Sequence, residues 1–279
     1  MNDTLADTDF RRARYLPSWP RPLGYRNARL SAEAGAGPDW ESPTSWQTVP
    51  VIEAIFFDGD QTLWDFETLM RRALARTLAE LRALRPGDAT SGLNVEDMIF
   101  DRTVVAAELN GTGVTLEALR QAAFARTLER TGKPDPAMAS QLNERYLHWR
   151  FIDVPLYPDV LPALALLGER YQLGLLSNGN GYPERSGLAG VFSAVVFSEQ
   201  HGIEKPDRRL FNIAAAEVGL RADQLVMVGD SLPNDAQGAC DAGWQGVWLN
   251  RGQQSPTELS ATHAITSLED LPALLERLT

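Results

Sequence analysis

The chain has 279 residues, of which 44% are hydrophobic and 23% are charged, and its formal net charge at pH 7 is −11. These values are typical of a globular protein with one large or two ordinary domains. The negative charge argues against broad nucleic-acid binding, which requires a basic footprint. No run of 18 or more apolar residues occurs, so we expect no membrane-spanning helix and no membrane partner.

The compartment is predicted from two further features of the sequence. Cys240 is the only cysteine, which excludes an intrachain disulfide. The first residues lack the basic start and apolar stretch of a secretory signal. Both features favour a reducing cytoplasm. The sequence gives no indication of an oligomeric state.

Residues 1–50 contain many prolines and glycines and show no sustained periodicity. This composition predicts an irregular N-terminal extension. Trp19, Trp40 and Trp46 lie within it, and burying such aromatic side chains would stabilise a docked segment. We expect a partly docked extension without a catalytic role.

The first strand-like run is apolar and ends in acids. Residues 51–57 read VIEAIFF and precede Asp58-Gly59-Asp60-Gln61-Thr62. Two carboxylates this close are costly unless a positive charge lies between them, and a hard cation with oxygen ligands is the usual compensation. The alternative is a solvated turn, because Asp and Gly are common turn residues.

Residues 67–155 are predicted to be helical. Leucines recur at helical spacing within 68–81, and further helical stretches cover 116–131 and 137–150. Arginines and acids interleave throughout, which favours solvated faces of a helical bundle. Trp64 and Phe66, just before this region, either line a substrate pocket or pack a hinge. The loop at 110–113 either reaches the active site or simply joins two helices.

Residues 156–279 alternate between strand-like and helix-like runs. The predicted strands are 173–176, 194–197, 225–228 and 246–249, and the predicted helices are 160–169, 207–218, 234–242 and 268–278. This alternation indicates a parallel sheet with helices on both faces. Ligands of such sheets bind beyond the carboxyl ends of the strands, where Asp58, Ser177 and Asp230 are all predicted to lie.

Three later segments complete a pattern with the first acidic one. Ser177-Asn178 follows a strand, Lys205-Pro206 precedes a helix, and Gly229-Asp230 with Asp235 follows another strand. In this order and at these element boundaries, the four segments resemble the motifs of the haloacid dehalogenase superfamily of aspartate-nucleophile hydrolases. The resemblance covers about residues 51–252. Each motif alone is weak, but the ordered set is specific.

The resemblance implies a fold of two parts. Residues 51–66 and 156–279 would form a Rossmann-like α/β core, and residues 67–155 would form a small α-helical cap between the first and second motifs. In the family, such an insertion is a mobile cover over the active site.

The resemblance also implies roles for the motif residues. Asp58 would be the nucleophile, and Asp60 would protonate the leaving oxygen and then activate water. A carboxyl group near pKa 4 is a poor acid at neutral pH, so Asp60 requires a raised pKa or only a brief role as an acid. Thr62 would orient Asp60 or donate to phosphate, and Ser177 would donate its hydroxyl to a phosphoryl oxygen.

The remaining motif residues would bind phosphate and a metal ion. Asn178 would support the phosphate-binding loop, and Lys205 would bind phosphate and compensate Asp58. The cofactor would be Mg²⁺, held by Asp58, Asp230 and the backbone carbonyl of Asp60. Asp235 would hold a metal-bound water or orient Lys205.

The sequence thus predicts a Mg²⁺-dependent phosphatase acting on a small-molecule phosphate ester. One alternative is a haloacid dehalogenase, although those relatives usually lack an acid at the position of Asp60. The other is a non-catalytic binding protein on the same scaffold, although such proteins typically lose the nucleophile or a metal ligand.

Overall fold

The structure is a computed structural model that describes residues 51–109, 111–252 and 263–278. The predicted N-terminal extension and Asn110 lie outside the described residues, and so do the extension's three tryptophans. None of the helices in the described ranges is both long and apolar enough to cross a membrane.

The core of the fold is a parallel sheet of six strands in the order β3-β2-β1-β4-β5-β6. The strands are β1 (Ala54–Phe57), β2 (Gln172–Ser177), β3 (Ala194–Phe197), β4 (Leu225–Gly229), β5 (Gln245–Leu249) and β6 (His263–Ile265). Every residue of β1 is buried, as expected for a central strand covered on both faces. The predicted α/β class is therefore confirmed.

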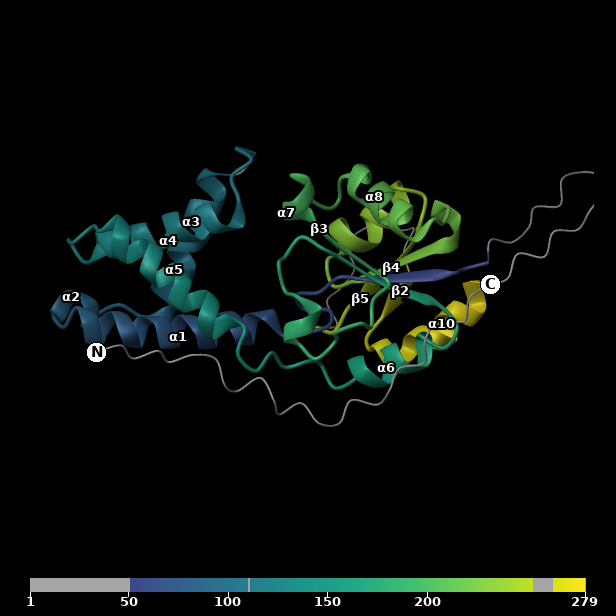
Figure 1. The fold of residues 1–279 in the computed structure, drawn as a ribbon, viewed down its shortest axis with the longest axis horizontal. Coiled ribbons are helices and arrows are strands. Elements are labelled where there is room, and N and C mark those ends of the chain that lie inside the picture. Colours follow the sequence, from purple (N-terminus) through teal and green to yellow (C-terminus); the bar gives the residue numbers. More distant parts are fainter. Residues whose placement is uncertain (1–50, 110, 253–262, 279) are drawn as a thin grey trace, which may run out of the picture. The chain divides into compact units, whose positions relative to one another are not determined.

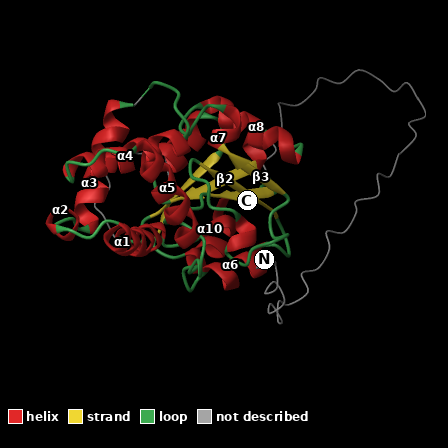
Figure 2. Ribbon diagram, turned by 60° about the vertical axis from the view of Figure 1, so that its left-hand side comes forward, coloured by secondary structure: helices red, strands yellow, loops and turns green. Residues whose placement is uncertain are grey.

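Helices cover both faces of this sheet. Figure 1 shows α8 on one side of the strands and α6 with α10 on the other, and Figure 2 shows the same layers from a second direction. These elements are α6 (Val160–Leu167), α7 (Ser198–His201), α8 (Arg208–Val218), α9 (Gly238–Asp241) and α10 (Leu271–Leu278), with short turns η1 (Pro183–Arg185), η2 (Ala222–Gln224), η3 (Leu232–Gln237) and η4 (Leu268–Asp270). Phe56, Phe211 and Trp244 pack together on the α8 side of the core.

Five of the six helices described between β1 and β2 form the part that we call the helical insertion, residues 66–150. They are α1 (Phe66–Leu84), α2 (Asp88–Ser91), α3 (Val95–Glu108), α4 (Leu116–Arg130) and α5 (Pro136–Arg150). Side-chain caps begin α1, α3, α4 and α5, each accepting a backbone N–H of the first turn. Leu81, Leu128 and Leu142 are fully buried in a hydrophobic core of the insertion's own.

Two adjacent chain segments join the insertion to the sheet. Asp65 N donates to Pro155 O at 3.4 Å, and Tyr157 N donates to Leu63 O at 3.1 Å. The side chain of Gln61, in the first acidic motif, accepts the backbone N–H of Glu67 in α1 at 3.1 Å. The segment after the first acidic motif is therefore hydrogen-bonded directly to the base of the insertion.

The structure differs from the predicted elements at three places. The run 234–242 is not one helix but the π-type turn η3 followed by the short α9. Strand β1 begins at Ala54 rather than at residue 51, and β6 has no counterpart among the predicted strands.

Candidate active site

The carboxyl ends of β1, β2 and β4 bring the four predicted motifs together. Asp58 follows β1 and is buried, and the Lys205 ammonium lies 2.8 Å from its Oδ1. The same ammonium donates to Asp235 Oδ1 at 2.6 Å and to the Leu176 carbonyl at 2.7 Å. All three hydrogens of Lys205 Nζ are thus used, and the lysine compensates Asp58 as the sequence predicts.

Three carboxylates gather at this edge of the sheet. Asp58, Asp230 and Asp235 each offer an oxygen within 4.8 Å of the others. Burial, together with repulsion from Asp58 and Asp235, raises the pKa of Asp230 to about 7. Burial and Asp58 also raise the pKa of Asp235 to about 6, although Lys205 opposes this shift. One lysine therefore does not neutralise the cluster, and a bound cation would.

This donor set fits Mg²⁺, which prefers oxygen ligands and keeps several waters. Asp235 is engaged on both oxygens, by Lys205 and by the backbone N–H of Ser231 at 3.0 Å. Because both of its oxygens already accept hydrogen bonds, Asp235 is better suited to orienting Lys205 than to binding the metal directly. The Asp60 carboxylate is not one of the three clustered groups, and its predicted contact through the backbone carbonyl stays a prediction.

Asp60 is held by a tryptophan that follows it in the same turn. Trp64 Nε1 donates to Asp60 Oδ1 at 2.7 Å, and Trp64 is only 2% exposed. The indole lies so close to Gly59 and Gly181 that a Cβ at either glycine would lie within 2.5 Å of it. Burial raises the pKa of Asp60, although Arg150 opposes this shift. A raised pKa is what a proton donor at neutral pH requires.

Two motif residues have different partners from those expected. The sequence predicts that Thr62 orients Asp60 or donates to phosphate, yet Thr62 is fully buried and its hydroxyl accepts the Asp230 backbone N–H at 3.0 Å. The amide of Asn178 both accepts from and donates to the Lys205 backbone, at 2.8 and 3.0 Å. Asn178 therefore ties the loop after β2 to the backbone of Lys205, and Thr62 joins the loops after β1 and β4.

Ser177 lies at the end of β2 with its side chain facing the same site. Its Oγ accepts the backbone N–H of Gly179 at 3.1 Å. That contact orients the hydroxyl and leaves its proton for an acceptor in the cavity. The predicted donation to a phosphoryl oxygen is compatible with this geometry.

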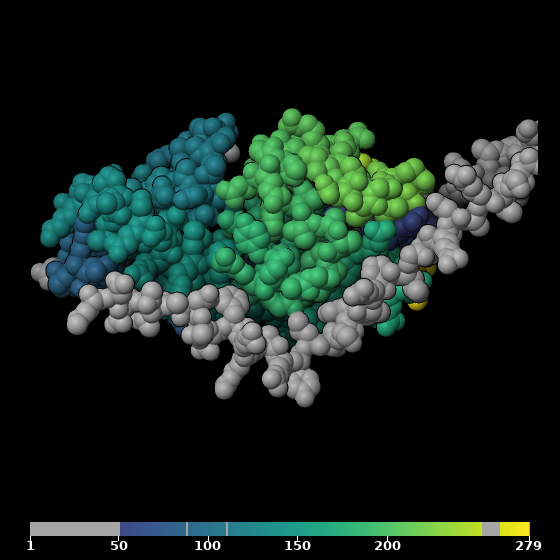
Figure 3. All heavy atoms as spheres, viewed as in Figure 1, coloured from purple at the N-terminus to yellow at the C-terminus, as the bar shows by residue number. Residues whose placement is uncertain are grey.

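A cavity of about 310 Å³ connects these core residues with the helical insertion. Figure 3 shows the blue-to-teal atoms of the insertion directly beside the green atoms of the core. The insertion's side of the cavity contains Phe66, Arg102, Leu116, Leu119, Arg120, Tyr146 and Arg150. The sequence predicts that the arginines of these helices lie on solvated faces. For Arg102, Arg120 and Arg150, which line the cavity, this prediction is wrong. Helical spacing does not reveal which polar face lies over the core.

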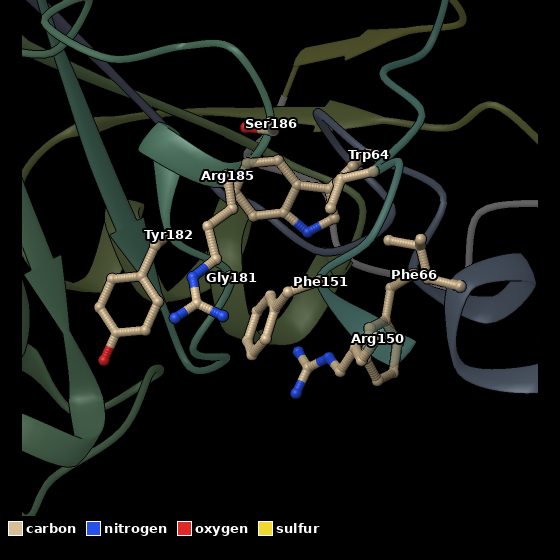
Figure 4. Close-up of a pocket in the computed structure, with 10 residues that line it drawn as sticks. Trp64, Phe66, Arg150, Phe151, Gly181, Tyr182, Arg185 and Ser186 are labelled. Carbon is tan, nitrogen blue, oxygen red and sulfur yellow. The ribbon is translucent and has the colours of Figure 1, made fainter. Parts of the chain in front are cut away.

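Arg150 is fixed at the junction between the insertion and the core. Its Nη1 donates to Asn180 Oδ1 at 2.8 Å, and its guanidinium lies 4.7 Å from the Phe66 ring and 5.3 Å from the Phe151 ring. Figure 4 shows Arg150 beside Phe66 and Phe151, with Arg185 against the other side of Phe151. The hollow among these residues measures only about 10 Å³, roughly the room for one water.

The sequence leaves two roles open for Trp64 and Phe66, lining a substrate pocket or packing a hinge, and the structure gives a different answer for each. Trp64 does not line the larger cavity and instead packs at the junction while holding Asp60. Phe66 lines both spaces. In the loop at 110–113, Asn110 lies outside the described residues, and Thr112 is exposed rather than in the cavity.

Comparison with known proteins supports the same grouping of motifs. The model of the haloacid dehalogenase-like hydrolase family matches residues 52–243. The chain belongs to this family. Glyceraldehyde 3-phosphate phosphatase from Methanopyrus kandleri is 29% identical over 75% of this chain and 88% of its own length.

The names of two further similar proteins state different reactions. Phosphoserine phosphatase from Thermus thermophilus is 38% identical over 48% of this chain and 55% of that protein. A solved structure of a 2-haloacid dehalogenase from Pseudomonas syringae pv. Tomato DC3000 has a TM-score of 0.68 and 30% identity, covering 82% of this chain and all of that one. Membership of the family is thus shown, and the choice of reaction depends on the site.

Proposed function

We propose that this protein is a Mg²⁺-dependent phosphatase that hydrolyses a small phosphorylated metabolite through an aspartyl-phosphate intermediate. The observation that carries the proposal is Asp60, which is half-buried, lies two residues after Asp58 and is hydrogen-bonded to Trp64. A leaving alkoxide needs a proton, whereas a leaving halide does not. The phosphatase names of the curated relatives support the same choice.

The proposed reaction has two steps. An oxygen of the Asp58 carboxylate attacks phosphorus while Asp60 gives its proton to the leaving oxygen. Asp60 then accepts a proton from the water that hydrolyses the aspartyl-phosphate. Lys205 holds the Asp58 carboxylate, and the hydroxyl of Ser177 donates to a phosphoryl oxygen. The helical insertion would act as a cap that excludes bulk water during these steps.

Mg²⁺ would be held by Asp58, Asp230 and the backbone carbonyl of Asp60, and when bound it supplies positive charge that neutralises the transferring phosphoryl group. Asp235 would hold Lys205 from the other side. The cytoplasmic location and the lack of nucleic-acid partners expected from the sequence stay predictions.

Removal of the metal is the direct test of this proposal. We expect excess chelator to lower the hydrolysis of p-nitrophenyl phosphate by about a hundredfold or more, and added Mg²⁺ to restore it. Asp230→Asn should raise the Mg²⁺ concentration that gives half-maximal activity. Phosphate release that persists unchanged in chelator would refute the metal assignment.

Trp64→Phe tests the position of Asp60. The variant loses the hydrogen bond to Asp60 Oδ1, so we expect kcat to fall about ten- to a hundredfold for an alkyl phosphate. The loss should be smaller for p-nitrophenyl phosphate, whose leaving group needs less help from an acid. Trp149→Phe is the matched control, because its Nε1 likewise donates to a carboxylate, Glu80, at 2.6 Å, but outside the cavity. Equal losses for both esters would contradict the positioning role.

A dehalogenase is the second candidate, because the solved structure from Pseudomonas syringae carries that activity in its name. In that case, Asp58 would attack carbon and no metal would be needed. Chloride release from 2-chloropropionate in the presence of chelator, without phosphate release from any ester, would favour this second reaction.

A further inference from the structure

The insertion's side of the cavity is lined by arginines from three different helices. Arg102 lies on α3, Arg120 on α4 and Arg150 on α5, and all three line the cavity that contains Asp58 and Asp60. Successive arginines are 18 and 30 residues apart in sequence, so their meeting depends on how the helices pack. In a chain of net charge −11, such a local gathering of positive charge requires a reason.

The phenol of Tyr146 shows that these charges converge. Burial raises the pKa of the Tyr146 hydroxyl above its ordinary value. Three positive charges oppose this shift through space, those of Arg150, Arg102 and Arg120. The negative charge of Asp60 adds to the shift, so one side chain lies within electrostatic reach of the arginines and of the proposed acid.

Only one of the three arginines is well compensated by the protein. Arg150 has Asn180 as a hydrogen-bond partner and two aromatic rings beside it, and its Nη2 lies 3.9 Å from Asp60 Oδ2. Arg150 therefore faces the reacting groups themselves. Arg102 and Arg120 line the same cavity and have few hydrogen-bond partners among the described residues.

Arg120 is only 9% exposed, and its one hydrogen bond to a described residue is from Nε to the neutral amide oxygen of Asn143, at 3.2 Å. Glu199 and Glu117 act on it through space, but no carboxylate of the described chain forms an ion pair with it. Burial, and then Arg150, lower the pKa of its guanidinium. A buried charge without a counter-ion is costly, and a bound anion would remove that cost.

Arg102 is half-buried and has neither a hydrogen bond nor an ion pair within the described parts of the chain. Arg102 nevertheless lines the cavity, and its charge acts on Tyr146. Guanidinium groups bind carboxylates and phosphates through two parallel hydrogen bonds. Two such groups on one side of a cavity are suited to a single small anion.

We infer that Arg102 and Arg120 form an anion-binding subsite opposite the Asp58 site, so that the substrate is a phosphate ester carrying a second anionic group. This inference rests on the proposed function and deepens it. The ester phosphate binds at the core side, beside Ser177 and the carboxylates. The second anion, a carboxylate or another phosphate, binds at the insertion's side, and the whole cavity of about 310 Å³ suits a small ester with a short carbon skeleton.

Matched substrate pairs test the subsite in the full-length protein with Mg²⁺. The first pair, 3-phosphoglycerate and glycerol 1-phosphate, differs by a carboxylate. The second pair, fructose 1,6-bisphosphate and fructose 6-phosphate, differs by a phosphate. In one pair, we expect kcat/KM to be about tenfold or more higher for the ester with the second anionic group. That pair identifies the second anion. Equal values within both pairs would overturn the inference.

Charge-removing variants assign this preference to the arginines. Arg102→Gln and Arg120→Gln should each lower by about tenfold the ratio of kcat/KM between the ester with the second anionic group and the ester without it. Arg145→Gln should keep the ratio, because this exposed arginine of α5 pairs with Glu80 outside the cavity. If Arg120→Gln does not fold, the less buried Arg102→Gln decides. Variants that depress both members of a pair equally would show that the arginines act on the reacting phosphate or on folding instead.

A binding measurement separates failure of the subsite from failure of the proposed function. Calorimetric titration of Asp58→Asn with the same esters needs no turnover. We expect Asp58→Asn to bind the ester with the second anionic group about tenfold more tightly, and Asp58→Asn/Arg102→Gln to lose this preference. That result supports the subsite even if wild-type protein releases no phosphate. Equal affinity within both pairs overturns it, whatever the activity.

Discussion

Asp58→Asn is expected to lower phosphate ester turnover by on the order of 10⁴-fold or more, because the amide is not an anionic nucleophile. Asparagine has nearly the same shape, and its oxygen still accepts a hydrogen bond from Lys205. The fold should therefore survive, which circular dichroism and the melting temperature would check. Steady-state phosphate release with Mg²⁺ gives the loss.

Asp223→Asn is the matched control for this substitution. Asp223 is exposed, and its carboxylate is 3.0 Å from Arg221 Nη2 at the surface. Its substitution should leave turnover within about twofold of wild type, as is usual for surface changes.

Acid-quenched protein digested for mass spectrometry should carry phosphate on the peptide that contains Asp58. Phosphate on a different residue would contradict the nucleophile assignment.

Lys205→Met is expected to have the largest effect on stability. Lys205 is 2% exposed and bonds to Asp58, Asp235 and the Leu176 carbonyl. Methionine fills a similar volume but leaves two buried carboxylates without their counter-charge. Breaking a buried ion pair in this way costs about 3–5 kcal/mol of the free energy of unfolding. Urea denaturation in the presence of chelator would measure it.

Two further variants test whether the loss of stability in Lys205→Met comes from the buried contacts of this lysine. Lys133→Met removes an exposed ammonium and should change the free energy of unfolding by less than about 0.5 kcal/mol. The double variant Lys205→Met/Asp235→Asn removes one of the stranded charges, so it should recover part of the lost stability. Turnover should not recover, because Asp58 still lacks its lysine. A double variant less stable than Lys205→Met would contradict the ion-pair explanation.

The sequence by itself determined five strands of the sheet and the grouping of the four motifs. Buried parallel strands are continuous apolar runs, so β1, β2 and β4 could be read directly. Their carboxyl ends share one edge of the sheet, and hence Asp58, Ser177 and Asp230 had to meet there. The short β6 and the turn at Pro233 were missed, because three residues show no periodicity and a π-type turn resembles a helix in its pattern.

Only the tertiary structure decided which partner each polar side chain takes. Thr62 pairs with the Asp230 loop, 168 residues away, rather than with Asp60, and Trp64 holds Asp60 instead of lining the substrate cavity. Arg102 and Arg120 read as solvated positions on charged helices, yet both line the cavity. Helical periodicity separates the apolar face from the polar faces, but the packing of the insertion on the core determines which polar face meets solvent and which meets the active site.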